Sequence, residues 1–152
     1  MKKTIITLLA LVAVVLTAMA QERPIRWRLA VSRVAPDSAV VTVRAIVAPG
    51  WHLYGTEMPA DGPRPTTFDF SGSEGVEPAG EMTPDRAPVE GTDEMFGAPL
   101  SWWDAPVAFA MPVRITAPEA FTVKVTVGFM GCNDMTCLPP STQTLTYRPA
   151  TD

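Results

Sequence analysis

Histidine and cysteine are scarce in this sequence: its 152 residues contain one histidine, His52, and two cysteines, Cys132 and Cys137. A structural zinc site needs four ligands, so these three residues are too few for one. His52 also lies outside any Ser-His or Cys-His motif that would activate a nucleophile. We therefore expect no metal, no cofactor and no hydrolase chemistry.

Positive charge is also in short supply. The chain carries 12 Lys and Arg against 16 Asp and Glu, for a formal net charge of −4, and two of the lysines stand at positions 2 and 3. The other basic residues are nearly all arginines that occur singly. Because nucleic-acid-binding domains carry clustered basic residues, this pattern excludes nucleic acid as an expected partner.

Long hydrophobic runs are absent except at the N-terminus. Residues 5–16 form an apolar run that follows two lysines and precedes a small-x-small site at 18–20, a pattern typical of a secretory signal peptide. The run is shorter than the roughly 20 apolar residues of a transmembrane helix. We predict cleavage after Ala20. Residues 21–152 are then expected to be one soluble, monomeric periplasmic domain without a membrane anchor, in a compartment where disulfides persist.

No segment offers ten residues of helical periodicity without a proline, and the chain has 16 prolines. Apolar residues instead alternate with polar ones, the period expected of half-buried strands. Short strands separated by turn residues predict an all-β fold, an immunoglobulin-like antiparallel β-sandwich. Residues 74–103 alternate weakly and are predicted to be long irregular connections. The expected strands are 25–34, 38–48, 66–70, 105–115, 121–130 and 141–147.

The two cysteines lie in the segment GCNDMTCLPP, residues 131–140, between two predicted strands that we expect to pair. Their Cα atoms should then fall in the window of about 4.4–6.8 Å that a disulfide needs. A structural bridge is one interpretation, although closing so short a loop contributes only about 2 kcal/mol. A second interpretation is a copper(I) site with thioether ligands from Met95, Met130 or Met135, which we do not expect because a methionine in a β-domain usually fills the core. The third interpretation is a redox pair.

Three segments add a resemblance to these patterns. They are PGWHLYGTEMPADGPRPTTFDF (49–70), GTDEMFGAP (91–99) and VTVGFMGCNDMTCLPP (125–140). In this order they resemble the N-terminal periplasmic domain of the thiol:disulfide interchange protein DsbD, an immunoglobulin-like domain. The last segment is the most specific, since a strand ends in aromatic-x-Gly-Cys and the second cysteine precedes an apolar residue and Pro-Pro.

The resemblance implies a redox role for Cys132 and Cys137. They match a pair that takes electrons from a membrane-linked thioredoxin-like domain and passes them to periplasmic thioredoxin-fold partners. The best-known members have one more residue between the cysteines. Since the sequence ends at Asp152, before any membrane domain, the electron donor is expected to be a separate membrane protein.

The same resemblance implies an environment for the cysteine pair. The segment DEMFG matches a cap loop that covers the pair, with Met95 or Phe96 over the sulfur atoms and two carboxylates beside them. The segment WHLY matches an aromatic stretch packed near the cysteines. The residues so implied are Asp93, Glu94, Met95, Phe96, His52 and Tyr54.

Negative charge near the sulfur atoms should make the reduced pair slow to react. Asp134 lies between the cysteines, and carboxylates and apolar cover both disfavour a thiolate. A different class of function also fits the sequence: a non-catalytic secreted β-sandwich with a structural disulfide that binds a protein or glycan. For that alternative, Trp102 and Trp103 of an exposed LSWWDAP segment would line the binding surface; otherwise one is a core and one an edge residue.

Overall fold

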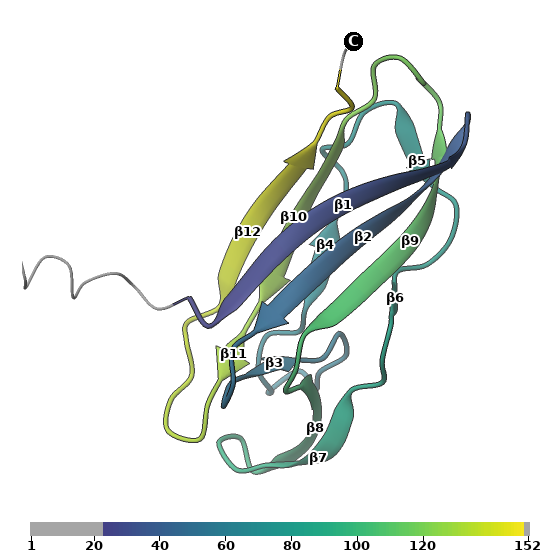
Figure 1. The fold of residues 1–152 in the computed structure, drawn as a ribbon. Helices are drawn as coiled ribbons and strands as arrows, with labels where there is room; N and C mark the ends of the chain where they lie inside the picture. Colours follow the sequence, from purple (N-terminus) through teal and green to yellow (C-terminus); the bar gives the residue numbers. More distant parts are fainter. Residues whose placement is uncertain (1–22, 151–152) are drawn as a thin grey trace, which may run out of the picture.

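Twelve β-strands and no helix make up residues 23–150, the part of the chain that this computed structural model describes (Figure 1). The predicted signal peptide, residues 1–20, lies outside the described residues. None of the described residues belongs to a helix long and apolar enough to cross a membrane. All strand pairs are antiparallel, which confirms the predicted all-β fold.

The first of three sheets is built on three long strands. Its order is β1-β2-β9-β5, and β6 also pairs with β9. Every second residue of β2 and β9 is buried, so the sheet turns one apolar face to the core. Its strands are β1 (Ile25–Ala35), β2 (Ser38–Val47), β5 (Val76–Pro78), β6 (Thr83–Pro84) and β9 (Val107–Ile115).

The second sheet has the order β12-β10-β4 and packs across the core from the first. Its central strand buries Val123, Val125 and Val127 completely. The predicted pairing of the strands on either side of the cysteines is confirmed, since β10 pairs with β12 along its whole length. The strands are β4 (Thr67–Asp69), β10 (Val123–Phe129) and β12 (Ser141–Tyr147).

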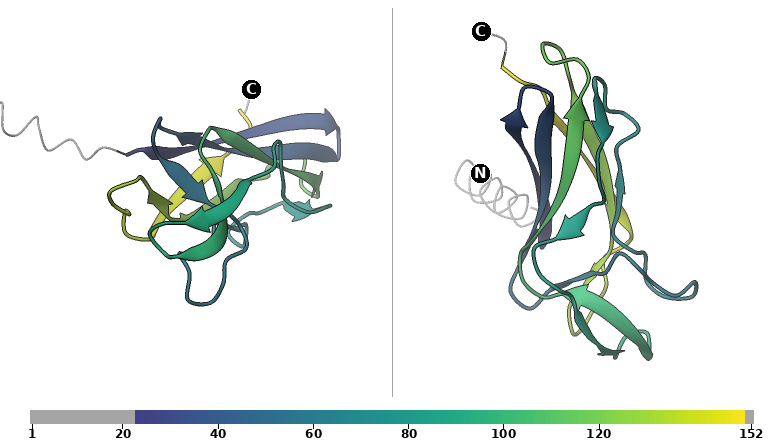
Figure 2. Two further views of the ribbon diagram at one scale, coloured as in Figure 1. Left: turned by 90° about the horizontal axis from the view of Figure 1, so that it is seen from below. Right: turned by 90° about the vertical axis from the view of Figure 1, so that its right-hand side faces the viewer.

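A third, small sheet of order β11-β3-β8-β7 lies at one end of the sandwich, opposite the end where β12 stops (Figures 1 and 2). It was not foreseen from the sequence. Its strands are short and are formed by hydrogen bonds to strands distant in the chain. Their own sequences therefore show little alternation of apolar and polar residues. Its strands are β3 (His52–Tyr54), β7 (Val89–Asp93), β8 (Ala98–Trp103) and β11 (Gly131–Cys132).

The prediction that residues 74–103 are irregular is therefore wrong, because they contain the four strands β5 to β8. The expected strand 121–130 is also shorter than predicted. It breaks at Met130, and the chain then leaves the second sheet to pair Gly131 and Cys132 with β3. This change of partner carries the first cysteine out of the sandwich core and into the third sheet.

Candidate redox site

The two faces of the third sheet have different roles, set by its register. Directly opposed residues of antiparallel strands share a face, and alternate residues of one strand do too. Leu53 opposes Trp103, and both belong to the main core. Tyr54 opposes Trp102, and Cys132 opposes His52, so these four side chains share the outward face.

Trp103 therefore cannot line an exposed binding surface. It is only 3% exposed and donates a hydrogen bond from its indole nitrogen to the Arg86 carbonyl at 3.1 Å. Trp102 is half-buried on the other face, with its ring 5.6 Å from that of His52. The expectation of an exposed LSWWDAP segment is wrong, because Leu100 is buried as well.

The cysteines face each other across a hairpin and form a disulfide. The Leu138 amide donates to the Gly131 carbonyl and the Asn133 amide to the Thr136 carbonyl, both at 2.9 Å. Cys132 and Cys137 are thus a non-hydrogen-bonded pair, the position at which antiparallel strands approach most closely. Their Cα atoms are 4.0 Å apart, which is shorter than the expected window.

The hairpin loop of residues 133–136 is held by one side chain. The Asn133 Oδ1 atom accepts hydrogen bonds from the Met135 and Thr136 amides, at 2.9 and 2.8 Å. This Asx turn leaves Asp134 and Met135 pointing into solvent, and Met135 is 89% exposed.

The two cysteines differ in burial. Cys132 has no exposed surface and forms a small apolar cluster with Tyr54 and Leu100, separate from the main core. Cys137 packs against that cluster but is only half-buried. Gly131 precedes Cys132 at a position where an added Cβ atom would displace the end of the Ile25 side chain, so glycine lets β11 approach β1 closely. Of the two cysteines, Cys137 is the more exposed residue.

The loop joining β7 to β8 is held by the same kind of turn as residues 133–136, which we call the cysteine loop. Asp93 Oδ1 accepts hydrogen bonds from the Met95 and Phe96 amides, at 2.9 and 3.0 Å. Gly97, with a φ of 63°, closes the turn by donating its amide to the Asp93 carbonyl at 2.8 Å. Both loops read Asx-acidic-Met, and this local pattern is the sequence signal by which Asn133 could have been found.

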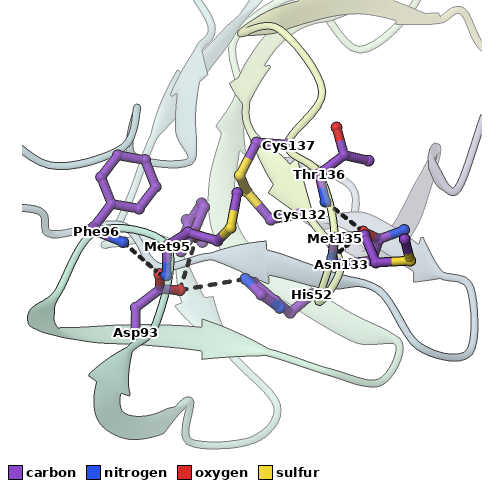
Figure 3. A network of polar contacts seen from close by, with 10 residues as sticks. His52, Asp93, Met95, Phe96, Cys132, Asn133, Met135, Thr136 and Cys137 are labelled. Carbon is purple, nitrogen blue, oxygen red and sulfur yellow. Dashed lines mark hydrogen bonds and ion pairs between the residues drawn. A yellow bond between two sulfur atoms is a disulfide. The ribbon is translucent and has the colours of Figure 1, made fainter.

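The second carboxylate oxygen of Asp93 points inward, toward the side chains of β3 (Figure 3). Its Oδ2 accepts a hydrogen bond from the Tyr54 hydroxyl at 2.9 Å and lies 3.6 Å from His52 Nε2. Burial and the hydrogen bond to Asp93 both raise the pKa of Tyr54, so the hydroxyl remains a donor at neutral pH. Asp93, only 5% exposed, thus connects the loop to Tyr54 of β3 through hydrogen bonds.

His52 is neutral at neutral pH. Burial lowers its pKa, and the attraction of Asp93, Asp134 and Asp104 for a protonated ring opposes that shift only in part. Its Nε2 atom is buried and makes no hydrogen bond. The ring packs edge-on against Tyr54 at 5.0 Å between centroids.

All the residues named from the resemblance lie at this end of the molecule. The Met95 side chain extends toward the disulfide, and Phe96 lies on the other side of the loop (Figure 3) with its ring edge-on to Tyr54 at 5.8 Å. Met95 and Phe96 remain 48% and 36% exposed, and Glu94 is exposed. Leu100 belongs to the same cluster and was not predicted as a site residue. Trp102 and Met130 pack against the cluster; the sequence had suggested them only for the alternatives, as a binding-surface residue and a copper ligand.

A family model described as thiol:disulfide interchange protein DsbD, N-terminal, matches residues 21–149. The chain belongs to the DsbD N-terminal family. The match confirms the resemblance drawn from the three segments, and it extends over both sheets of the sandwich as well as the third. No curated protein matches the sequence of this DsbD N-terminal domain.

Solved structures share the fold. The Neisseria meningitidis DsbD N-terminal domain in its reduced form is 21% identical, with a TM-score of 0.55 and coverage of 87% of this chain and 95% of that one. A complex between the DsbD and PilB N-terminal domains of the same organism gives 22% identity, a TM-score of 0.54 and coverage of 88% and 94%. The N-terminal periplasmic domain of Proteus mirabilis ScsB gives 14% identity, a TM-score of 0.61 and coverage of 84% and 47%.

The stability of this DsbD N-terminal domain should decrease in mild acid because of His52. The unfolded chain binds a proton on this residue near pH 6.5, whereas the folded chain does so only at lower pH, since burial lowers the folded pKa. The stabilisation is therefore complete above pH 6.5 and is lost as pH falls through the folded pKa.

The single histidine makes this prediction measurable by NMR, because its ring resonance is unambiguous. The midpoint should lie below 6.5, and Asp93→Asn should lower it further by removing an attractive charge. Urea unfolding at several pH values should show a weaker acid dependence for His52→Gln than for the wild type. A wild-type midpoint at or above 6.5 would contradict the assignment of a buried, neutral ring.

Proposed function

We propose that this domain is a periplasmic thiol–disulfide relay, which passes reducing equivalents between thioredoxin-fold proteins through Cys132 and Cys137. The observation that carries the proposal is the position of the disulfide. It spans four loop residues at one end of the sandwich and joins neither main sheet to the other. Such a bridge contributes little to stability, about 2 kcal/mol, and can open without loss of the fold.

Two relatives support the choice of partner and compartment. The solved complex of a DsbD N-terminal domain with a PilB N-terminal domain shows that a domain of this fold binds another protein domain. The ScsB relative is described as periplasmic, which agrees with the signal peptide predicted over residues 1–20. The electron donor is a separate membrane protein in this proposal, and the domain acts as a monomer.

The difference in burial between the cysteines sets the order of the exchange. A partner thiolate attacks the accessible Cys137 sulfur, the disulfide breaks, and Cys132 leaves as a thiolate that takes up a proton. The second partner thiol then loses its proton and attacks the mixed disulfide, which releases Cys137. The partner dithiol is oxidised to a disulfide, and the domain disulfide is reduced to a dithiol.

The loop of residues 94–97 acts as the cap in this proposal. Met95 extends toward the sulfur atoms, and Asp93 ties the loop to Tyr54. Asp134 and Glu94 add negative charge that disfavours a free thiolate. The reduced pair is thereby protected from stray oxidants until a partner displaces the cap.

A redox titration of the mature protein tests the proposal. An exchanging pair should have a potential in the range of thioredoxin-fold proteins, roughly −270 to −120 mV, whereas structural disulfides fall below about −300 mV. The measurement is the equilibrium of Cys132–Cys137 with a glutathione or dithiothreitol buffer, followed by alkylation. A value far below that range, together with no exchange with any thioredoxin-fold protein, would show that the bridge is structural.

The alternative of a binding module with a structural disulfide loses its main support. It relied on two adjacent tryptophans at the surface, and Trp103 is buried in the main core.

A further inference from the structure

A cleft of about 520 Å³ lies between the cap loop and the cysteine loop. Its aromatic walls come from Trp51, His52 and Trp102. Residues of both hairpin loops border it, so a partner that reaches the disulfide between these loops also meets the cleft.

The charge of this cleft has one sign. Its carboxylates belong to Asp93, Glu94, Asp104 and Asp134, and none of the lysines and arginines within residues 23–150 lines it. Among these described residues its one basic side chain is His52, which is neutral at neutral pH because burial lowers its pKa. Asp93 is buried and its oxygens are used in hydrogen bonds, which leaves three exposed carboxylates facing an incoming molecule.

Apolar side chains stand at the tips of both loops. Met95 is 48% exposed on the cap loop, and Met135 is 89% exposed on the cysteine loop. Exposed methionines beside a charged cleft are suited to contact with a protein surface, because they adapt to different shapes while the charges orient the partner. The carboxylates are therefore placed where they act on whatever approaches Cys137.

We infer that Glu94, Asp104 and Asp134 determine specificity, by favouring partners that carry positive charge beside their reactive sulfur. This inference rests on the proposed relay function and adds the chemical class of its partner. Three carboxylates attract a positively charged partner and repel a negatively charged one, whereas they have little effect on a neutral partner. A basic thioredoxin-fold surface would thus be chosen over an acidic one.

Small disulfides test the inference without knowledge of the natural partner. The reduced mature protein is mixed with cystamine, bis(2-hydroxyethyl) disulfide or dithiodiglycolate, which are cationic, neutral and anionic. In each reaction the protein dithiol becomes a disulfide and the reagent accepts two protons and two electrons to give two thiols. Each rate is divided by the rate of dithiothreitol with the same reagent, which removes intrinsic differences in reactivity.

The normalised rate with cystamine should exceed that with dithiodiglycolate by about tenfold at low salt. The ratio should shrink at 0.5 M salt, where screening acts over a few ångströms. The triple variant Glu94→Gln, Asp104→Asn, Asp134→Asn should bring it close to one. Glu90→Gln is the matched control, since Glu90 lies on the same hairpin, is exposed and does not line the cleft; it should keep the wild-type ratio.

The outcomes separate this inference from the relay function. Exchange with all three reagents at equal normalised rates would overturn the charge selectivity and leave the relay intact. A loss of selectivity in Glu90→Gln equal, per charge removed, to that of the triple variant would assign the effect to net charge instead of the cleft, which also overturns it. Slow exchange with all three reagents is expected of a capped pair and leaves the relay intact, whereas a pair that stays reduced even at equilibrium with the neutral reagent would count against the relay itself.

Discussion

Replacing both cysteines by serine should abolish thiol–disulfide exchange and leave the fold in place. The main core contains neither cysteine, and the Cys132–Cys137 bridge closes a loop of only four residues. Its loss should reduce the free energy of unfolding by about 2–3 kcal/mol. Serine is smaller and more polar than half a cystine, and its burial at position 132 contributes to that figure.

Urea unfolding and an exchange assay with a reduced thioredoxin-fold protein measure the two effects. The reduced wild-type protein is the matched control for stability, because it also lacks the bridge but keeps both sulfur atoms. Its free energy of unfolding should lie between that of the oxidised protein and that of the Cys132→Ser, Cys137→Ser variant. Collapse of the fold in both bridge-free forms would make the disulfide a structural staple.

Replacing Asp93 by alanine should expose the reduced cysteines and destabilise the domain. The change removes the acceptor for the Met95 and Phe96 amides and leaves the buried Tyr54 hydroxyl without its partner. An unsatisfied buried hydroxyl together with a lost turn should reduce stability by about 2–4 kcal/mol. Asp93 holds the cap most directly, so its loss should favour opening of the cap. Weakening the closed cap by about 1.4 kcal/mol already increases the open population tenfold, so we expect alkylation of the reduced pair to accelerate about tenfold or more.

Asp93→Asn is the matched variant that separates the turn from the charge. Asparagine holds the same kind of turn at Asn133, with two amides bonded to its Oδ1 atom, so the cap should stay closed. The measurement is the rate of iodoacetamide alkylation after reduction, with far-UV circular dichroism to confirm that each variant is folded. If alanine and asparagine change the rate equally, Asp93 acts through its charge and does not fasten the cap.

Alternation in the sequence predicted the body of the fold correctly. In β2 and β9 every second residue is buried, since each strand is long and has one face on the core. A period of two is then visible over seven or more residues, and it identifies the strands and the sandwich together.

The third sheet escaped prediction for the opposite reason. Its strands β3 and β11 have three and two residues, too few for a period to be recognised. Their pairing brings positions 52 and 132 together, and no local pattern specifies a partner eighty residues away. The resemblance to a family named residues on these strands, yet it could not give the sheet that holds them.

The class of the fold, the loop that carries both cysteines and the segments that surround them could all be predicted from the sequence. The side chains that face the sulfur atoms could be identified only from the pairing of the strands in three dimensions. Trp102 and Trp103 are adjacent in sequence, but the pairing of β8 with β3 turns one to the site and the other to the core. Likewise Asp93 of β7 reaches Tyr54 of β3 because both strands pair with β8. The physical reason is that side-chain direction in a sheet follows register, and register is set by long-range contacts that burial of the whole core selects.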